Sequence, residues 1–320
     1  MTLPANTLTL HPPAKVNLSL AVLDRRPDGY HTLETLYERL ALADELRLTR
    51  CPSGLTLACG DPAIPTDDRN LVIRAARLFF ETAGVAGGVQ AALVKRIPVA
   101  SGLGGGSSDA ASTLLGLNTL YGAPLTRDAL MALGGRLGAD IPFFVSEEVV
   151  AWGRGRGDEI TPAAAPVRPL WHVLVNPGLP VLTREVYERF DRLGPAALTP
   201  PPTDGTLLAR LVQAGDPARL AGRLVNALEP AIEASYQAIR DLKAVLSSAG
   251  AHGVLVSGSG PTTYGLADDE AHARAIAARV RRDRPAWTIE VTRTALPRSA
   301  SLHGGRRESE DMNQRCSPTR

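Results

Sequence analysis

The stretch that decides the fold runs Pro98-Val-Ala-Ser-Gly-Leu-Gly-Gly-Gly-Ser-Ser-Asp-Ala-Ala111. Its four glycines within five positions let the backbone approach a ligand closely and adopt positive φ angles. A strand is expected before it, over 89–99, and a helix after it, from about Ser108 to Tyr121, whose first free N–H groups and dipole favour an anion. This order of elements predicts a phosphate-binding loop. A purely structural turn is the alternative, although glycine loses much conformational entropy on folding.

Two better-known phosphate-binding patterns do not fit this loop. No Gly-Lys-Ser or Gly-Lys-Thr closes it, so it is not the loop of a P-loop NTPase. Ser107 occupies the position where Gly-x-Gly-x-x-Gly would need its third glycine, which disfavours a dinucleotide-binding oxidoreductase.

The composition describes the class of protein around the loop. The chain has 320 residues, 44% of them hydrophobic, which favours two domains. Its 35 basic and 33 acidic residues nearly balance, so binding to nucleic acid is not expected. No signal peptide or membrane span is evident, and the odd set Cys51, Cys59 and Cys316 lacks zinc-ligand spacing. We therefore expect a cytoplasmic enzyme with no membrane contact and no metal site of its own.

Periodicity outlines the first half of the chain. Residues 14–23 alternate as a strand whose polar face carries Lys15, Asn17 and Ser19. A Pro-Asp-Gly turn follows at 27–29, and 50–67 is interpreted as a hairpin and loop. The remaining predicted elements are helices over 70–83 and 127–138 and a short buried segment over 141–145.

The second half begins after a Pro- and Ala-rich boundary at 163–169. Its predicted elements are a strand over 171–178, a helix over 183–193, a proline-rich loop at 199–203, one long amphipathic helix over 229–249, a strand running into a glycine turn over 252–261, a helix over 270–283 and a strand over 287–296. This β-α-α-β-α-β order predicts an α+β sandwich. The polar, aperiodic segment 298–320 is predicted to be a disordered tail.

Three motifs in order resemble those of the GHMP kinases. They are Pro13-Ala-Lys-Val-Asn-Leu18, the glycine loop, and Ser257-Gly-Ser-Gly-Pro-Thr262, and the resemblance covers about residues 11–296. It implies an α+β GHMP kinase fold: a domain like the second domain of ribosomal protein S5 over 1–165 and a ferredoxin-like domain over 170–297. It also implies an active site between the two domains that uses ATP and Mg²⁺, with the metal carried by the nucleotide.

Two further segments narrow the resemblance within this superfamily. Arg25-Arg-Pro-Asp-Gly-Tyr-His-Thr-Leu33 and Gly138-Ala-Asp-Ile-Pro-Phe-Phe144 are similar to the branch whose small-molecule substrate is cytidine diphosphate methylerythritol. That branch acts in the non-mevalonate route to isoprenoids. The resemblance implies phosphorylation of the 2-hydroxyl of this substrate, by a monomer or a homodimer.

The predicted catalytic pair is Lys15 and Asp140. Asp140 lies among apolar neighbours, and a base must sit within hydrogen-bond reach of the proton that it accepts. Lysine is rare here, with three residues against 32 arginines, which suggests a need for a compact ammonium group at the positions that keep it. By resemblance Asp140 deprotonates the acceptor hydroxyl and Lys15 stabilises its carboxylate. A helix-capping Asp140 and a surface Lys15 are the alternatives.

The resemblance also supplies the binding residues. ATP contacts are expected from Pro98, Ser101, Gly102, Leu103, Gly104, Gly105, Gly106, Ser107 and Ser108 of the loop, and from Asn70 and Lys95 at the adenine. Substrate contacts are expected from Asn17, Tyr30, His31, Asp140, Thr183 and Tyr187, and from Ser257, Gly258, Ser259 and Gly260 of the second glycine turn. Tyr30 would stack on the cytosine and His31 would bind its edge, and one such stack contributes about 1–3 kcal/mol. Structural roles for Asn17, Asn70, Lys95 and Tyr187 remain open.

Two other functions remain possible from the sequence. Another GHMP kinase, for homoserine or mevalonate, would share the loop, but its substrate contains no cytosine for Asp28-Gly-Tyr-His31 to bind. A non-catalytic nucleotide- or RNA-binding module would have no use for Lys15 and Asp140 together with the glycine loop.

Overall fold

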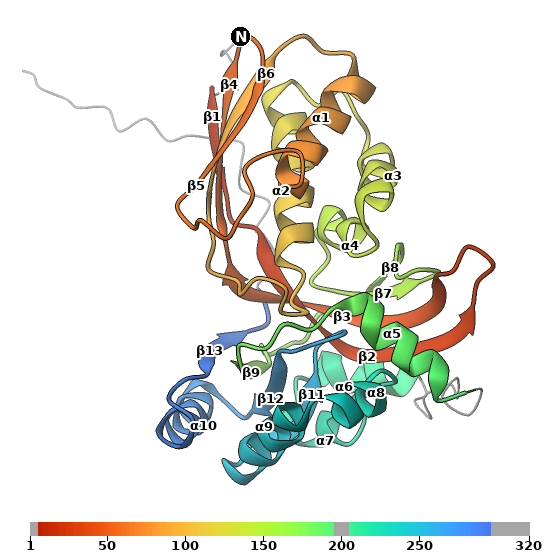
Figure 1. Ribbon diagram of the computed structural model, residues 1–320, viewed down its shortest axis with the longest axis vertical. Helices are drawn as coiled ribbons and strands as arrows, with labels where there is room; N and C mark the ends of the chain where they lie inside the picture. The colour runs from red at the N-terminus through yellow and green to blue at the C-terminus, as the bar shows by residue number, and fades with distance from the viewer. Residues whose placement is uncertain (1–5, 195–204, 296–320) are drawn as a thin grey trace, which may run out of the picture.

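The computed structural model describes residues 6–194 and 205–295 of the chain. These residues form an upper and a lower half that meet at the level of β2 and β3, a junction called the waist below (Figure 1). The loop expected at 199–203 and the tail expected at 298–320 lie outside the described residues. No helix among the described residues is both long enough and apolar enough to cross a bilayer.

The upper half contains one sheet with helices on one face. The strand order is β1 (Thr7–Leu10), β4 (Glu45–Cys51), β6 (Gly88–Val94) and β5 (Leu55–Cys59), and the helices are α1 (Leu71–Ala83), α2 (Gly105–Leu120), α3 (Arg127–Leu137) and α4 (Ile141–Ser146). The hairpin predicted over 50–67 is wrong, because β6 lies between β4 and β5 in the sheet. β5 instead runs parallel to β6, with α1 as the crossover between them. A parallel pair needs such a crossover, which the local turn residues did not reveal.

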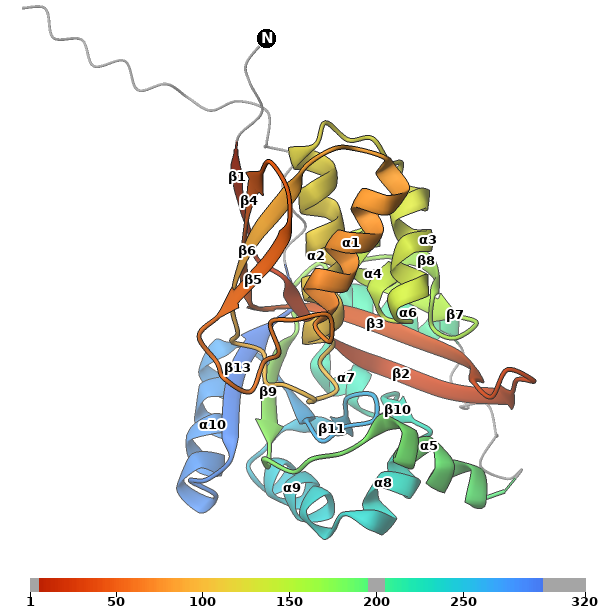
Figure 2. The ribbon, with the colours of Figure 1, turned by 45° about the horizontal axis from the view of Figure 1, so that its top comes forward.

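A second sheet crosses the waist. Its order is β10 (Val225–Asn226), β2 (Pro13–Arg25), β3 (His31–Ala43), β7 (Val150–Arg154) and β8 (Glu159–Ala163). Figure 2 shows β2 and β3 running side by side between the helices of the two halves. Because both faces of β2 are covered, the predicted polar face of this strand is buried: Lys15, Asn17 and Ser19 are each at most 4% exposed. Buried polar groups need partners, and Lys15 and Asn17 find theirs in the site described below.

The lower half has the ferredoxin-like order. Its antiparallel sheet runs β11 (His252–Val256), β12 (Thr263–Ala267), β9 (Trp171–Asn176) and β13 (Thr288–Arg293). Its helices are α5 (Thr183–Arg192), α6 (Gly205–Ala214), α7 (Pro217–Ala221), α8 (Glu229–Ser235), α9 (Gln237–Ser248) and α10 (Glu270–Asp283). The sequence pattern missed β12, whose five residues are all buried and therefore do not alternate. The single helix predicted over 229–249 is also wrong, because Tyr236 is extended and separates α8 from α9.

The termini of two upper helices set the positions of site residues. Asn70 caps α1 by accepting a hydrogen bond from the Val72 amide, and the left-handed Gly84 ends the helix as predicted. Helix α2 begins at Gly105, three residues earlier than predicted, after Gly104 at φ 70°. The glycine loop therefore supplies the first turn of α2 itself.

Candidate active site

Lys15 and Asp140 meet at the waist. Lys15 comes from the buried strand β2, and Asp140 immediately precedes α4. Nζ of Lys15 lies 3.5 Å from Oδ2 of Asp140 and donates to Oδ1 of Asn17 at 2.7 Å. The lysine side chain is 4% exposed and the aspartate side chain 32% exposed. The carboxylate thus borders solvent while its cation is buried behind it. The structure brings together the pair that the sequence predicted.

Tyr37 of β3 is the other partner of Asp140. Its hydroxyl donates to Oδ1 of Asp140 at 3.0 Å, and its ring stacks on Phe143 with centroids 4.8 Å apart. Burial, reinforced by the Asp140 carboxylate, raises the pKa of Tyr37 well above its usual value. The phenol therefore remains protonated and donates its hydrogen bond to Oδ1 of Asp140. The other oxygen, Oδ2, faces Lys15 and has no bond from Tyr37 that would keep a substrate hydroxyl away.

The glycine loop closes onto Lys15 from the upper half. The Lys15 amide donates to the Leu103 carbonyl at 3.0 Å. A Cβ on Gly104 would lie 3.0 Å from Cγ of Lys15 and equally close to the Phe144 ring, so only glycine packs here without displacing the lysine. Gly104 also has a positive φ, which disfavours any side chain.

The second glycine turn reaches the same lysine from the lower half. A Cβ on Gly258 would lie 3.4 Å from Oδ1 of Asn17 and 3.5 Å from Nζ of Lys15. Asn226 of β10 fixes this turn by donating to the carbonyls of Val256 and Gly258. One glycine turn from each half therefore converges on Lys15.

The two glycine turns also contact each other. The Ser257 hydroxyl donates to the Gly102 carbonyl at 3.0 Å, and a Cβ on Gly102 would lie 2.2 Å from the Ser257 carbonyl oxygen. The Thr262 amide donates to the Ser101 carbonyl at 3.2 Å. The waist is thus held by close backbone contacts that tolerate no side chain at Gly102.

The loop fits a phosphate chain. No side chain caps α2, so the amides of its first turn have no side-chain acceptor. The Ser108 hydroxyl is buried with no hydrogen-bond partner among the described residues, while Ser107 and Gly106 are partly open to solvent. Unpaired amides and a hydroxyl at a helix N-terminus form a suitable anion site. Pro98 and Leu103 frame this loop, and Leu103 is buried.

The two residues predicted for the adenine already have protein partners. The Asn70 amide group donates to the Pro65 carbonyl, which adds to its capping bond. Nζ of Lys95 is paired with Asp44 and lies 2.8 Å from Oδ2 of Asp109. Because one ammonium serves two buried carboxylates, burial and Asp44 raise the pKa of Asp109 to about 7 despite the attraction of Lys95. Lys95 nevertheless borders the loop, 3.2 Å from the Cβ position of Gly105.

The residues predicted to bind cytosine separate into two groups. Nε2 of His31 lies 2.7 Å from Oδ1 of Asp191, and the His31 ring stacks on Tyr187 at 4.9 Å. Burial, reinforced by the Asp140 carboxylate, raises the pKa of Tyr187. Tyr30, in contrast, is 58% exposed and faces the guanidinium of Arg156.

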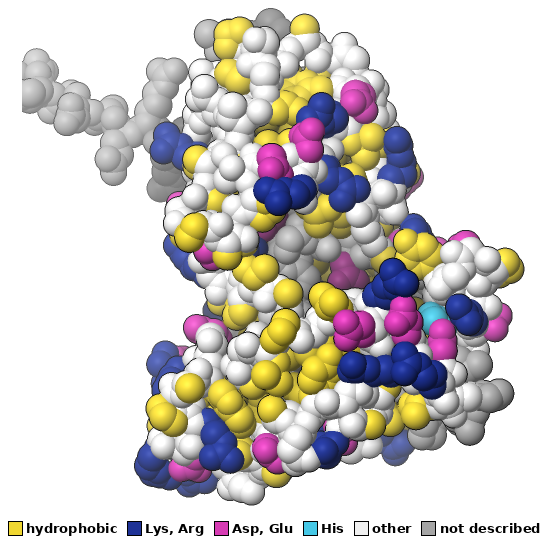
Figure 3. Space-filling model, viewed as in Figure 1, with side chains coloured by type: hydrophobic (Ala, Val, Ile, Leu, Met, Phe, Trp, Pro, Cys, Tyr) yellow, Lys and Arg dark blue, Asp and Glu magenta, His cyan; other side chains and the backbone are white. Residues whose placement is uncertain are grey.

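The N-terminal end of α5 is attached to the second glycine turn. The hydroxyls of Thr183 and Ser259 lie 2.8 Å apart, and either can donate. This bond joins two residues that were both predicted to contact substrate. Seen from the surface, the outline of the molecule is indented on the left side between the two halves (Figure 3).

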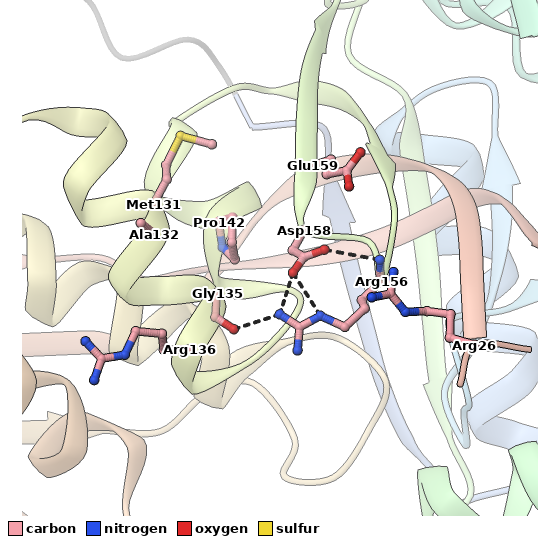
Figure 4. A pocket seen from close by; sticks show the side chains of 9 residues that line it. All are labelled: Arg26, Met131, Ala132, Gly135, Arg136, Pro142, Arg156, Asp158 and Glu159. Atoms are coloured by element: carbon pink, nitrogen blue, oxygen red, sulfur yellow. Dashed lines mark hydrogen bonds and ion pairs between the residues drawn. The ribbon is translucent and has the colours of Figure 1, made fainter. Parts of the chain in front are cut away.

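A separate open cavity of about 610 Å³ lies beside this site. Figure 4 shows Arg156 of its wall bonded to Asp158 and to the Gly135 carbonyl. Neither Lys15 nor Asp140 lines this cavity. It adjoins the exposed Tyr30 through Arg156, so it lies next to the β2–β3 turn and not at the Lys15–Asp140 pair.

Sequence reasoning missed three residues of the site: Tyr37, Asp191 and Asn226. Asp191 follows Tyr187 by four positions on α5, a spacing that places two side chains on one helix face. That spacing could have indicated, from the sequence alone, that Asp191 accompanies Tyr187 in the site. Tyr37 and Asn226 reach the site through strand pairings, β2 with β3 and β10 with β2, that no local pattern indicates.

Comparison with known proteins agrees with this geometry. The model of the GHMP kinases N terminal domain matches residues 70–148, and that of the GHMP kinases C terminal domain matches residues 206–286. The 4-diphosphocytidyl-2-C-methyl-D-erythritol kinase of Geobacter metallireducens is 43% identical over 272 residues, which cover 85% of this chain and 93% of the relative. That of Deinococcus radiodurans is 41% identical over 293 residues, covering 91% and 95%.

Solved structures give the same assignment. A crystal structure of 4-(cytidine 5'-diphospho)-2C-methyl-D-erythritol kinase superposes with a TM-score of 0.76 at 37% identity, covering 90% of this chain and all of the other. Homoserine kinase from Cytophaga hutchinsonii has a TM-score of 0.70 at 19% identity, covering 92% and 96%, which shows the shared fold alone. With its two glycine turns, its lysine–aspartate pair and these relatives, the chain belongs to the 4-diphosphocytidyl-2-C-methyl-D-erythritol kinases of the GHMP kinase superfamily.

Proposed function

We propose that this chain transfers the terminal phosphoryl group of ATP to the 2-hydroxyl of 4-(cytidine 5'-diphospho)-2-C-methyl-D-erythritol, a step in the non-mevalonate route to isoprenoid precursors. The observation that carries the proposal is the convergence of two glycine turns on Lys15, whose ammonium lies 3.5 Å from Asp140. An anion site, a buried cation and a partly exposed carboxylate are together what transfer to an alcohol requires.

Asp140 acts as the base in this proposal. Oδ1 is held by the Tyr37 hydroxyl, so Oδ2 accepts the proton of the acceptor hydroxyl. Lys15 balances the carboxylate charge and is itself held by Asn17. ATP supplies the phosphoryl group, and its Mg²⁺ offsets the phosphate charge. Ser107 or Ser108, at the start of α2, would contact that metal in this proposal, and Mg²⁺ needs few protein ligands beside phosphate and water.

The cytidine end of the substrate would lie against α5 and the β2–β3 turn. Tyr187 and His31 offer an aromatic surface, and Asp191 orients the His31 ring. The second glycine turn, fixed by Asn226, offers backbone amides to the diphosphate. Asn17 already bonds Lys15 and Thr35, so its role is to hold the lysine.

A coupled ADP-release assay over a panel of acceptors tests the proposal. The panel contains the cytidyl methylerythritol, free methylerythritol, homoserine, mevalonate and galactose. Turnover of the first compound alone is expected, because only that compound carries the cytidine that α5 and His31 would bind. Turnover of homoserine or mevalonate would assign the chain to another GHMP activity. RNA binding with no ADP release from any alcohol would contradict a kinase function.

A further inference from the structure

Three metal-ligand side chains meet in the lower half, away from the catalytic pair. They are His252, the first residue of β11, Asp268, which follows the end of β12, and His272, in the first turn of α10. The catalytic end of β11 is the Ser257 turn, five residues along the strand, which corresponds to roughly 16 Å. The cluster therefore does not belong to the site described above. No metal site was expected from the sequence, because its three cysteines lack zinc-ligand spacing and the Mg²⁺ was assigned to the nucleotide.

The three side chains share one carboxylate. Nε2 of His252 lies 2.9 Å from Oδ1 of Asp268, and Nδ1 of His272 lies 2.9 Å from Oδ2. The two imidazole rings are nearly perpendicular, at 84°, with centroids 5.5 Å apart. One potential ligand atom from each residue lies within 4.8 Å of the other two. Bonds of about 2.0–2.2 Å to a four-coordinate ion separate its ligands by roughly 3–3.5 Å, so small side-chain rotations suffice to surround an ion.

The backbone fixes two of these side chains. His252 pairs with Leu266 across the β11–β12 ladder, which places it beside the end of β12 and therefore beside Asp268. Asp269 caps α10 by accepting a hydrogen bond from the His272 amide at 2.8 Å. This bond fixes the first turn of the helix, so that His272 lies next to Asp268. The convergence is thus a consequence of the ferredoxin-like topology and not of flexible side chains meeting by chance.

Several charged side chains of α10 and of its N-terminal cap lie near the cluster. Asp269 and Glu270 add negative charge on α10, although Glu270 is paired with Arg274. The Arg279 guanidinium, on the same helix, donates to the Ala249 carbonyl at 3.0 Å. The Asp268 amide also points to Nδ1 of His272 at 3.3 Å, a long contact that an ion would replace. The local balance is net negative, which favours a cation.

We propose that His252, Asp268 and His272 bind one divalent transition-metal ion, such as Zn²⁺, that links β11, β12 and α10. Two imidazoles and one carboxylate suit zinc, nickel and copper, whereas Mg²⁺ and Ca²⁺ prefer oxygen ligands alone. The side chains are 28–58% exposed, so water completes the coordination. The ion has a structural effect here: it holds together three elements of one domain.

Zinc titration tests the proposal. The untagged full-length chain is stripped of metal and kept in excess Mg²⁺, and zinc binding is measured by calorimetry and by the change in Tm that zinc causes. The variants His252→Gln and His272→Gln each remove a nitrogen ligand, and Asp268→Asn removes the carboxylate. His11→Gln is the matched control, since His11 is an exposed histidine in the short link between β1 and β2, outside the cluster. Zinc is expected to raise the Tm of the parent and of the control, and each ligand variant is expected to bind at least about tenfold more weakly.

Two results would overturn the proposal. One is that the parent shows no saturable zinc binding in the presence of Mg²⁺. The other is that all three ligand variants retain the zinc affinity and the zinc-dependent Tm shift of the parent, which would place any bound zinc on other histidines or on thiols. Cobalt substitution gives an independent measurement, because its visible absorption reports nitrogen and oxygen ligands directly and is expected to disappear in His272→Gln.

Discussion

The Tyr37 hydroxyl donates to Oδ1 of Asp140 at 3.0 Å, and two glycines create the space in which it does so. A Cβ on Gly153 would lie 2.5 Å from the Tyr37 ring, and one on Gly157 would lie 2.6 Å from its hydroxyl oxygen. The β7–β8 hairpin is therefore shaped around this tyrosine. Tyr37 thus holds one carboxylate oxygen of the proposed base in place.

Tyr37→Phe removes this bond while keeping the ring stacked on Phe143. A hydrogen bond to a carboxylate is worth about 1.5–3 kcal/mol, so kcat is expected to fall by about tenfold or more with little change in KM. Steady-state kinetics of purified protein measure both constants. Tyr121→Phe is the matched control, because its hydroxyl bonds only the Gly88 backbone, in the upper half. An unchanged kcat in Tyr37→Phe would remove the positioning role.

Asp140→Asn keeps the size of the proposed base and removes its ability to accept a proton. Turnover is expected to fall by about 100-fold or more, the usual contribution of general base catalysis. ATP binding, measured by calorimetry, is expected to persist because the glycine loop is untouched. Turnover within tenfold of the parent would exclude Asp140 from this role.

Gly102→Ala is expected to separate the two glycine turns. Its Cβ would lie 2.2 Å from the Ser257 carbonyl oxygen, so backbone must move, at a cost of about 1–3 kcal/mol beyond the strain of the positive φ. Both the Tm and turnover should decrease. Gly122→Ala is the control, since it has a similar φ of 83° but open space around its Cβ. Equal losses of Tm and turnover in the two variants would show that backbone strain, and not contact across the waist, matters.

Asp191→Asn tests the predicted cytidine end of the site. Asp191 holds His31 at 2.7 Å, so the variant is expected to raise KM for the cytidyl substrate by about tenfold while KM for ATP stays unchanged. Exposed Asp128 of α3 provides a control as Asp128→Asn. An equal rise in both KM values would place Asp191 in a general structural role.

The buried cluster of Lys95, Asp44 and Asp109 should make stability depend on pH. The pKa of Asp109 rises from 3.8 to about 7 on folding, so the folded state holds its proton more tightly than the unfolded chain. The stabilisation from this proton is complete below about pH 4 and is lost as the pH rises through about 7. Asp109→Asn cannot ionise, so its unfolding free energy should decrease less than that of the parent between pH 5 and 8. Urea unfolding at both pH values measures the difference, which is on the order of 1 kcal/mol or more. Identical pH dependence in the two proteins would contradict the shift.

Local patterns predicted those elements that have a regular hydrophobic periodicity and recognisable capping residues. The helices α1, α3, α5 and α10 followed from periodicity and caps, as at Asn70 and Gly84. The topology of β5 and the break at Tyr236 could not be predicted in this way. Both depend on which segments pack together, and an extended residue between two amphipathic turns has no local marker.

The kind of chemistry could be predicted from the amino-acid sequence alone. The glycine loop, Lys15 and Asp140 appear in it directly, because a phosphate cradle needs glycines and a helix start, and a base needs a carboxylate. The groups that support that chemistry could be identified only from the folded chain. Tyr37, Asp191 and Asn226 lie far along the chain from the atoms that they hold, and only strand pairing and helix packing bring them within hydrogen-bond distance.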